Sequence, residues 1–374
     1  MRIAPLTSLF LDGLRSVAAI GVMFAHLDNS RLVPGAGGLQ PYGGFFVVAF
    51  FVLSGFVISA TTNRQQSDGV RYFAARLARL WTVALPALLV AFLLQKVCEA
   101  ISPSFIGNFD RGHSDLRYLL SATFSNELWF TSSGPPMILP VWSLAYEFWY
   151  YVIFGIAVYV RQRYVQIIGL LVIFGFVGPK ILALLPVWLI GVGAWKTTRF
   201  RETLTQWVPW IVGGSVTLLT ALIVKHPRWP DEIGYAPWFF SGAWISDSIF
   251  SLGIAGLIVG VDAGLYGCHV PRVWSVIIRR SAGVSFSLYL LHFPLMVSCA
   301  ALLPYNSASY LSVALILCLI LVIVYLFGVI FEPQRKKWTP RLELTMRVLV
   351  SHLPTWFAVC ARTKSAEGGR PQAD

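Results

Sequence analysis

Three residues with chemically reactive side chains, Asp12, Arg15 and His26, interrupt one apolar stretch near the start of the chain, residues 9–27. Arg15 and His26 are eleven positions apart. That spacing is about 1100° of helical rotation, so both side chains fall on one helix face about 16 Å apart along the axis. An imidazole is suited to general-base chemistry near neutral pH. The pattern predicts a polar stripe with a guanidinium at one end and a base at the other. The alternative is an Asp12–Arg15 pair at a membrane edge with an interfacial histidine.

A second polar face opens the apolar stretch 138–160, where Trp142, Ser143 and Glu147 occur among several aromatic residues. A carboxylate inside such a stretch is costly without a partner. A guanidinium or an imidazole from the first stretch would be a suitable partner. The aromatic residues also fit a belt at the membrane–water interface.

Two other groups have a functional and a structural interpretation. Arg76 and Arg79, at positions i and i+3, form a fork that suits phosphate groups, or they anchor the chain beside a membrane. Tyr289 and His292 lie roughly on one predicted helix face, near a proline that can kink the helix. A lone histidine in that position is also compatible with a structural role. Asp247 is the only acid well within its apolar stretch.

The elements that must position these side chains follow from the composition. The chain has 374 residues, of which 56 % are apolar and 12 % charged, whereas a soluble domain carries about 25 % charged residues. This excludes an ordinary soluble enzyme, a disordered chain and a disulfide-stapled module. The prediction is an all-α polytopic membrane protein with about ten transmembrane helices. The predicted spans are residues 9–27, 43–61, 82–101, 138–160, 165–178, 180–196, 208–224, 239–261, 282–303 and 309–331.

The net charge of +12 tests that topology. With the N-terminus in the cytoplasm, 21 of the 29 basic residues fall in inside segments and 6 in outside segments, as the positive-inside rule requires. Both termini are therefore expected in the cytoplasm, and the charge is interpreted as orientation and not as nucleic-acid binding. The predicted domains are a membrane domain, 1–334, and a basic cytoplasmic tail, 335–374, with an amphipathic helix over 335–347 and a disordered end. No metal site is predicted.

Five motifs together resemble the acyltransferase 3 family of integral-membrane acyltransferases. They occur in the family's order and cover residues 11–331. They are Leu11-Asp-Gly-Leu-Arg15 followed by His26, Phe50-Phe-Val-Leu-Ser-Gly-Phe56, Arg76-Leu-Ala-Arg79, Val141-Trp-Ser-Leu-Ala-Tyr-Glu147 and Ser287-Leu-Tyr-Leu-Leu-His-Phe-Pro294. Val48 and Phe148 stand where many members carry acids, so the acidic role falls to Glu147 alone.

The resemblance implies an acyltransferase of the bacterial inner membrane. It would move an acyl group, commonly acetyl, from cytoplasmic acyl-CoA to a hydroxyl of a surface or exported polysaccharide, lipopolysaccharide or glycolipid. Its partners would be acyl-CoA, this acceptor and membrane lipids, with no bound cofactor. His26, Glu147 and Arg15 would be catalytic, with Glu147 orienting His26. Arg76 and Arg79 would bind the phosphates of acyl-CoA, and the substrate-binding residues would be Asp12, Trp142, Ser143, Tyr289 and His292. The alternatives are a proton-coupled transporter or flippase of a glycan or lipid-linked intermediate, and a structural subunit.

Overall fold

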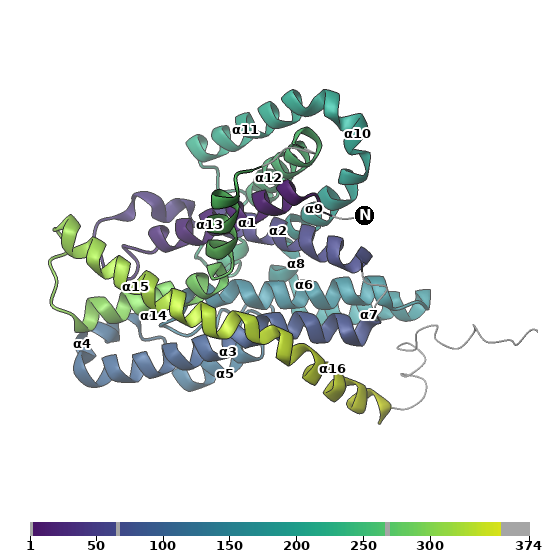
Figure 1. Ribbon diagram of the computed structural model, residues 1–374. Helices are drawn as coiled ribbons and strands as arrows, with labels where there is room; N and C mark the ends of the chain where they lie inside the picture. The colour runs from purple at the N-terminus through teal and green to yellow at the C-terminus, as the bar shows by residue number, and fades with distance from the viewer. Residues whose placement is uncertain (1–2, 65–67, 266–269, 353–374) are drawn as a thin grey trace, which may run out of the picture.

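Figure 1 shows the computed structural model of the chain, in which residues 3–64, 68–265 and 270–352 are described. Every regular element within these residues is a helix. The longer helices are α1 (Pro5–Ala25), α2 (Gly43–Arg64), α3 (Gly69–Ile101), α6 (Trp142–Tyr159), α7 (Arg163–Val177), α9 (Leu185–Thr197), α11 (Val208–Lys225), α12 (Trp244–Gly264), α13 (Arg272–Ala282), α14 (Ser285–Leu302), α15 (Tyr310–Phe331) and α16 (Arg335–Ser351). The shorter α-helices are α4 (Pro103–Ile106), α5 (Ser114–Ala122), α8 (Pro179–Ala183) and α10 (Arg201–Leu204). Short 3-10 helices are η1 (Gly37–Tyr42), η2 (Gly107–Phe109), η3 (Leu139–Val141), η4 (Thr198–Phe200), η5 (Thr205–Trp207), η6 (Phe239–Ser241) and η7 (Glu332–Gln334).

The all-helical, multi-pass character predicted from the composition is confirmed. Eight helical stretches within the described residues are long and apolar enough to cross a membrane, and α7 is a shorter apolar helix. One of the eight, residues 179–225, contains both the sixth and the seventh predicted spans. The count of ten and the cytoplasmic position of the termini therefore stay predictions.

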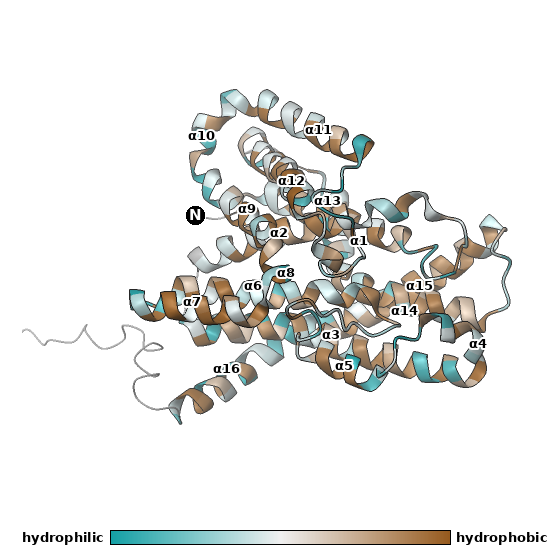
Figure 2. Cartoon of the chain, turned by 180° about the vertical axis from the view of Figure 1, so that it is seen from behind, coloured by the Kyte–Doolittle hydropathy of each residue, from teal (hydrophilic) through white to brown (hydrophobic). Residues whose placement is uncertain are grey.

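The outward faces of several helices are apolar, as a lipid environment requires. On α7, the side chains of Leu171 and Val172 are 64 % and 66 % exposed. Figure 2 shows the hydrophobic colours running along this helix. A soluble protein seldom exposes so continuous an apolar face, so these residues are expected to contact lipid chains.

The centre of the bundle is the crossing of α2 and α9, which pack closely together. A Cβ atom at Gly55 would lie 2.1 Å from the carbonyl oxygen of Trp188, and one at Gly191 would lie 2.1 Å from that of Val52. Glycine is therefore required on both helices, because the two backbones touch at this crossing. The crossing holds α2 firmly in place beside the polar residues of the site.

Helix α3 begins well before the predicted span 82–101, so it carries Arg76 and Arg79 within its length. The Asp68 side chain caps it by accepting a hydrogen bond from the Arg71 backbone N–H at 2.8 Å. Helix α16 runs along α3 (Figure 1), and Arg347 pairs with Asp68 at 2.6 Å. The predicted tail helix is thus present, while residues 353–374 of the predicted tail lie outside the described residues.

The long loop 102–136 contains α4 and α5 and is joined to α8 by a buried ion pair. The Lys180 ammonium and the Glu127 carboxylate are 2.5 Å apart, and both side chains are fully buried. Burial raises the pKa of Glu127, while the adjacent ammonium opposes that rise. The helical structure is interrupted between α7 and α8 at Gly178, whose φ of +81° favours glycine. The break occurs at the Gly–Pro pair that separates the fifth and sixth predicted spans.

Candidate active site

Two histidines that are distant in the sequence meet at one end of the bundle. His26 ends α1, and His292 lies on α14 with no exposed surface. His26 Nδ1 and His292 Nε2 are 2.8 Å apart, and the two rings are nearly parallel, with an interplanar angle of 9°. Both residues were singled out in the sequence, but their contact joins positions 266 residues apart and has no local signal.

The hydrogen bonds of this pair determine where its protons lie. His292 Nδ1 is 2.8 Å from the Leu288 carbonyl oxygen, which can only accept, so Nδ1 carries the proton and donates it. His292 Nε2 is then an acceptor, and His26 Nδ1 must donate to it. A neutral His26 is therefore left with an unprotonated Nε2, which is the form of imidazole that a general base needs.

His26 lines a cavity of about 220 Å³, here called the His26 cavity. Its walls come from α1, η1, α2, η3, α6, η6, α12, α14 and the loops beside them. Polar and aromatic side chains share this wall with His26, namely Asn29, Gln40, Trp142, Phe240, Asp247 and Tyr289. The His26 side chain thus lines a cavity that has both apolar and hydrogen-bonding surfaces.

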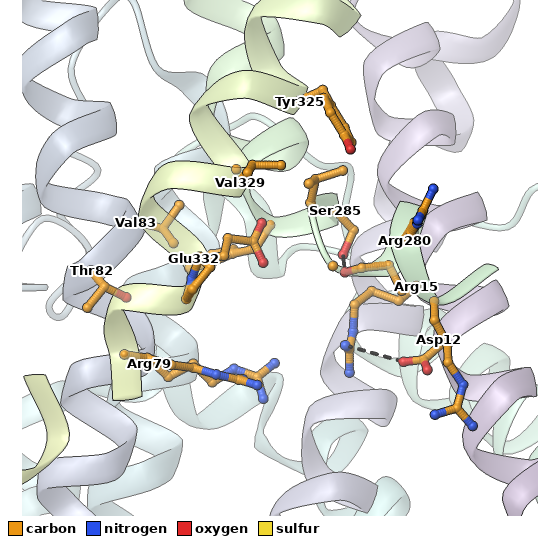
Figure 3. Close-up of a pocket in the computed structure, with 18 of the residues that line it drawn as sticks. Asp12, Arg15, Arg79, Thr82, Val83, Arg280, Ser285, Tyr325, Val329 and Glu332 are labelled. Atoms are coloured by element: carbon orange, nitrogen blue, oxygen red, sulfur yellow. Dashed lines mark hydrogen bonds and ion pairs between the residues drawn. The ribbon is translucent and has the colours of Figure 1, made fainter. Parts of the chain in front are cut away.

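A second cavity, of about 500 Å³, is rich in cations and is here called the basic cavity (Figure 3). In Figure 3, Arg79 and Arg15 point toward one another from opposite walls. Arg15 is 3.8 Å from Asp12. Six basic side chains and two acidic ones line this cavity: Arg15, Arg79, Arg279, Arg280, Arg335 and Lys336, with Asp12 and Glu332. Such an excess of guanidinium groups is typical of a site for phosphate groups.

A narrow connecting cavity of about 50 Å³ lies between these two. It shares Arg15 and Arg79 with the basic cavity and Tyr289 with the His26 cavity. The Tyr289 hydroxyl and Ser143 Oγ are 2.7 Å apart across it. The three cavities therefore form a series through the bundle, with the Tyr289–Ser143 hydrogen bond near the His26 end.

Glu147 lines the connecting cavity and is held by two hydroxyl groups. Ser54 Oγ donates to its Oε1 at 2.6 Å, and the Tyr151 hydroxyl donates to the same oxygen. Glu147 and Arg15 thus line the same cavity. The sequence analysis expected Glu147 to make the contact that orients His26. In the structure His292 makes a contact to His26.

The two arginines of the RxxR motif have different surroundings. Arg79 lines both the basic and the connecting cavities. The Arg76 guanidinium lies over the Tyr72 ring, 5.6 Å from its centroid, and donates to Thr61 Oγ1 at 3.4 Å. Only Arg79 therefore takes part in the cavity wall. Of the other predicted site residues, Asp12 and Arg15 line the basic cavity. Trp142 lines the His26 cavity, and His292 contacts His26.

Several residues of the site were missed in the sequence. Arg279, Arg280, Arg335 and Lys336 entered the sequence analysis only through the charge asymmetry. Ser54 entered it only as a member of the Phe50–Phe56 motif, and Glu332 did not enter it. Arg279 and Arg280 could have been identified from their position just before Ser285, which lines the same cavity. Residues 335 and 336 directly follow η7, whose Glu332 accepts a 2.8 Å hydrogen bond from Ser287 of the late motif.

The fold and these cavities define a helical membrane protein with a cavity rich in guanidinium groups and a buried pair of histidines. The sequence profile described as an acyltransferase domain, that of the acyltransferase 3 family, matches residues 8–332. The chain belongs to this family, so the predicted resemblance is confirmed.

Its curated relatives include the O-acetyltransferase OatA of Staphylococcus aureus strains NCTC 8325 and COL. Each is 27 % identical over 157 residues, which cover 40 % of this chain and 24 % of the relative. The match thus spans about a quarter of the length of these relatives. No solved structure matches the chain significantly.

Proposed function

We propose that this protein is an O-acyltransferase of the bacterial inner membrane. It transfers an acyl group, acetyl in the simplest case, from acyl-CoA to a hydroxyl of a cell-surface or exported saccharide or glycolipid. Family membership supports the reaction class, and the O-acetyltransferase name of the OatA relatives supports both oxygen as the acceptor atom and acetyl as the group. The observation that carries the proposal is the His26–His292–Leu288 chain, which leaves a basic nitrogen exposed in a cavity.

The basic cavity is the proposed donor site. Coenzyme A carries several phosphate charges, and the guanidinium groups of Arg15, Arg79 and Arg279 can bind them with paired N–H donors. Apart from Arg15, the basic residues on this wall belong to segments that are expected in the cytoplasm from the charge asymmetry, where acyl-CoA is also expected. Glu332 and Asp12 keep the cationic side chains from repelling one another when the site is empty.

The connecting cavity leads from the donor site toward the base. Its small volume suits the thin pantetheine arm, and its wall includes Ser143 and Tyr289, whose hydroxyls can bond to the acyl carbonyl oxygen. In this arrangement the acceptor hydroxyl occupies the His26 cavity and meets the thioester where the two cavities share Tyr289.

His26 acts as the general base for the attack. Its Nε2 takes the proton from the acceptor hydroxyl as the hydroxyl oxygen forms a bond to the acyl carbon. The carbon–sulfur bond then breaks, and the departing thiolate of coenzyme A takes the proton from the imidazolium. His292 stabilises the imidazolium by accepting from its Nδ1–H, and it acts as a positioning residue.

The test is incubation of the purified protein with radiolabelled acetyl-CoA and a glycan and lipid extract. Covalent label on a glycan is the expected result, whereas movement of a glycan without modification would indicate a transporter or flippase. His26→Ala is expected to abolish labelling although the variant still inserts into membranes. His113→Ala, which changes a histidine in the exposed loop 102–136, is the control and should label normally. Wild-type labelling by His26→Ala would remove the proposed mechanism.

A further inference from the structure

Asp247 is a buried acid that the proposed mechanism does not use. It lies in the first turn of α12, is 2 % exposed, and lines the His26 cavity. Its Oδ1 atom has no hydrogen-bond partner within the described part of the chain. A buried carboxylate oxygen without a partner is costly and uncommon in native proteins. Because the Asp247 residue also lines the cavity, a ligand bound there can supply a donor to its carboxyl group.

The nearest cation does not satisfy this carboxylate. Arg228 contributes favourable charge to Asp247, but no ion pair within 4.0 Å joins the two side chains among the described residues. The Arg228 guanidinium instead lies over the Phe45 ring and bonds to His226 Nε2 at 2.8 Å and to the Pro41 carbonyl oxygen. Arg228 does not line the cavity. It therefore acts on Asp247 from outside the cavity and leaves the carboxylate without a donor from this side chain.

The other walls of the cavity fit a sugar ring. Trp142 and Phe240 stack on each other with their centroids 4.2 Å apart and an angle of 3° between their planes. Both rings line the cavity with Asp247, and Gln40 supplies an amide side chain. An aromatic surface packs well against the C–H face of a sugar, and an ionised carboxylate accepts hydrogen bonds from its hydroxyls.

The charge of the wall selects among sugars. Asp247 is the one charged residue besides the titratable His26 among the described residues that line this cavity, and the same wall has no lysine or arginine. A sugar acid or a phosphorylated sugar would bring a negative charge into a site of low dielectric constant in which no lysine or arginine of the wall can pair with it. A cavity of about 220 Å³ is smaller than the range of about 300–1,000 Å³ that is usual for drug-sized ligands. It therefore fits about one ring.

We propose that Asp247 is an acceptor-binding residue and that the His26 cavity takes one neutral sugar ring of the acceptor. Asp247 accepts hydrogen bonds from one or two ring hydroxyls, and this places another hydroxyl at His26 Nε2. The inference rests on the proposed acyl transfer and adds the class of acceptor to it, a neutral sugar in preference to a sugar acid.

The experiment uses the full chain in lipid nanodiscs with radiolabelled acetyl-CoA. The probes are the methyl glycosides of glucose, galactose, mannose and N-acetylglucosamine, and the methyl glycosides of glucuronic and galacturonic acid. Asp247→Asn keeps the size of the side chain and removes its charge and one acceptor oxygen. Asp262→Asn is the matched control, because Asp262 lies on the same helix and bonds to Thr7, away from the cavity.

Ester formation on at least one neutral glycoside and on neither uronide is the expected result. Asp247→Asn should raise the KM for that glycoside at least tenfold with kcat within threefold of wild type, while Asp262→Asn leaves both unchanged. The inference is overturned if uronides are preferred, if Asp247→Asn behaves like Asp262→Asn, or if acetyl-CoA is consumed with no glycoside acylated. No consumption of acetyl-CoA by the wild-type protein under any condition would instead count against the proposed function.

Discussion

Replacing His292 tests the proton arrangement from which the mechanism is derived. In His292→Ala, His26 Nδ1 loses its buried acceptor, both in the free enzyme and in the imidazolium formed during transfer. A hydrogen bond to a charged group contributes about 1.5–3 kcal/mol. If that stabilisation is lost in the transition state, kcat falls about 10- to 150-fold, since about 1.4 kcal/mol is a factor of ten. The KM for acyl-CoA should not change, because His292 does not line the basic cavity.

The assay is steady-state release of coenzyme A with a saturating acceptor, measured for wild type, His292→Ala and His292→Gln. The amide oxygen of glutamine can accept from His26 Nδ1, so His292→Gln should recover part of the lost rate. Wild-type kcat in His292→Ala would refute the reasoning. Equal losses in the two variants, with normal thermal stability, would show that His292 fills space and does not hold a proton in place.

Two other variants test the cavity wall and the helix crossing. Arg79→Ala should raise the Kd of acyl-CoA at least tenfold in a binding titration. Arg76→Ala should raise it less, since of the two arginines only Arg79 lines the basic cavity. Equal effects of the two variants would contradict the different roles of the two arginines. Gly191→Ala should lower the melting temperature of the detergent-solubilised protein, because the new methyl group meets the Val52 carbonyl oxygen and overpacking costs about 1–3 kcal/mol. Gly193→Ala, two residues away on the same helix with nothing within 4 Å, is the control and should melt like wild type.

Helical periodicity predicted the relation between Arg15 and His26 because both lie on one continuous helix. The structure places Arg15 at the basic cavity and His26 in the cavity beyond the connecting one, as a separation of three turns implies. Periodicity could not predict that His292 contacts His26, because that contact depends on how α1 and α14 pack. The same limit applies to Asp247, whose missing partner is visible only when every neighbouring helix is in place.

The RxxR motif shows why spacing alone is insufficient. Residues at i and i+3 lie about 60° apart around a helix, so whether both line the same cavity depends on the neighbouring helices. Here the wall that includes α15 and η7 lies beside Arg79, while Arg76 lies against Tyr72 and Thr61. The helix that contains the third predicted span begins earlier than that span, at Gly69, because its basic first turns lower the local hydropathy although they continue the same helix.

The wall of the basic cavity has a consequence for how the protein is made. Arg335 and Lys336 belong to α16, the last helix in the described chain, and every other lining residue precedes them. The ribosome therefore adds these two cations after helices α1 to α15 have been synthesised. Until α16 docks along α3 and Arg347 reaches Asp68, one side of the cavity is open. Anion binding is thus among the last properties that the nascent protein acquires.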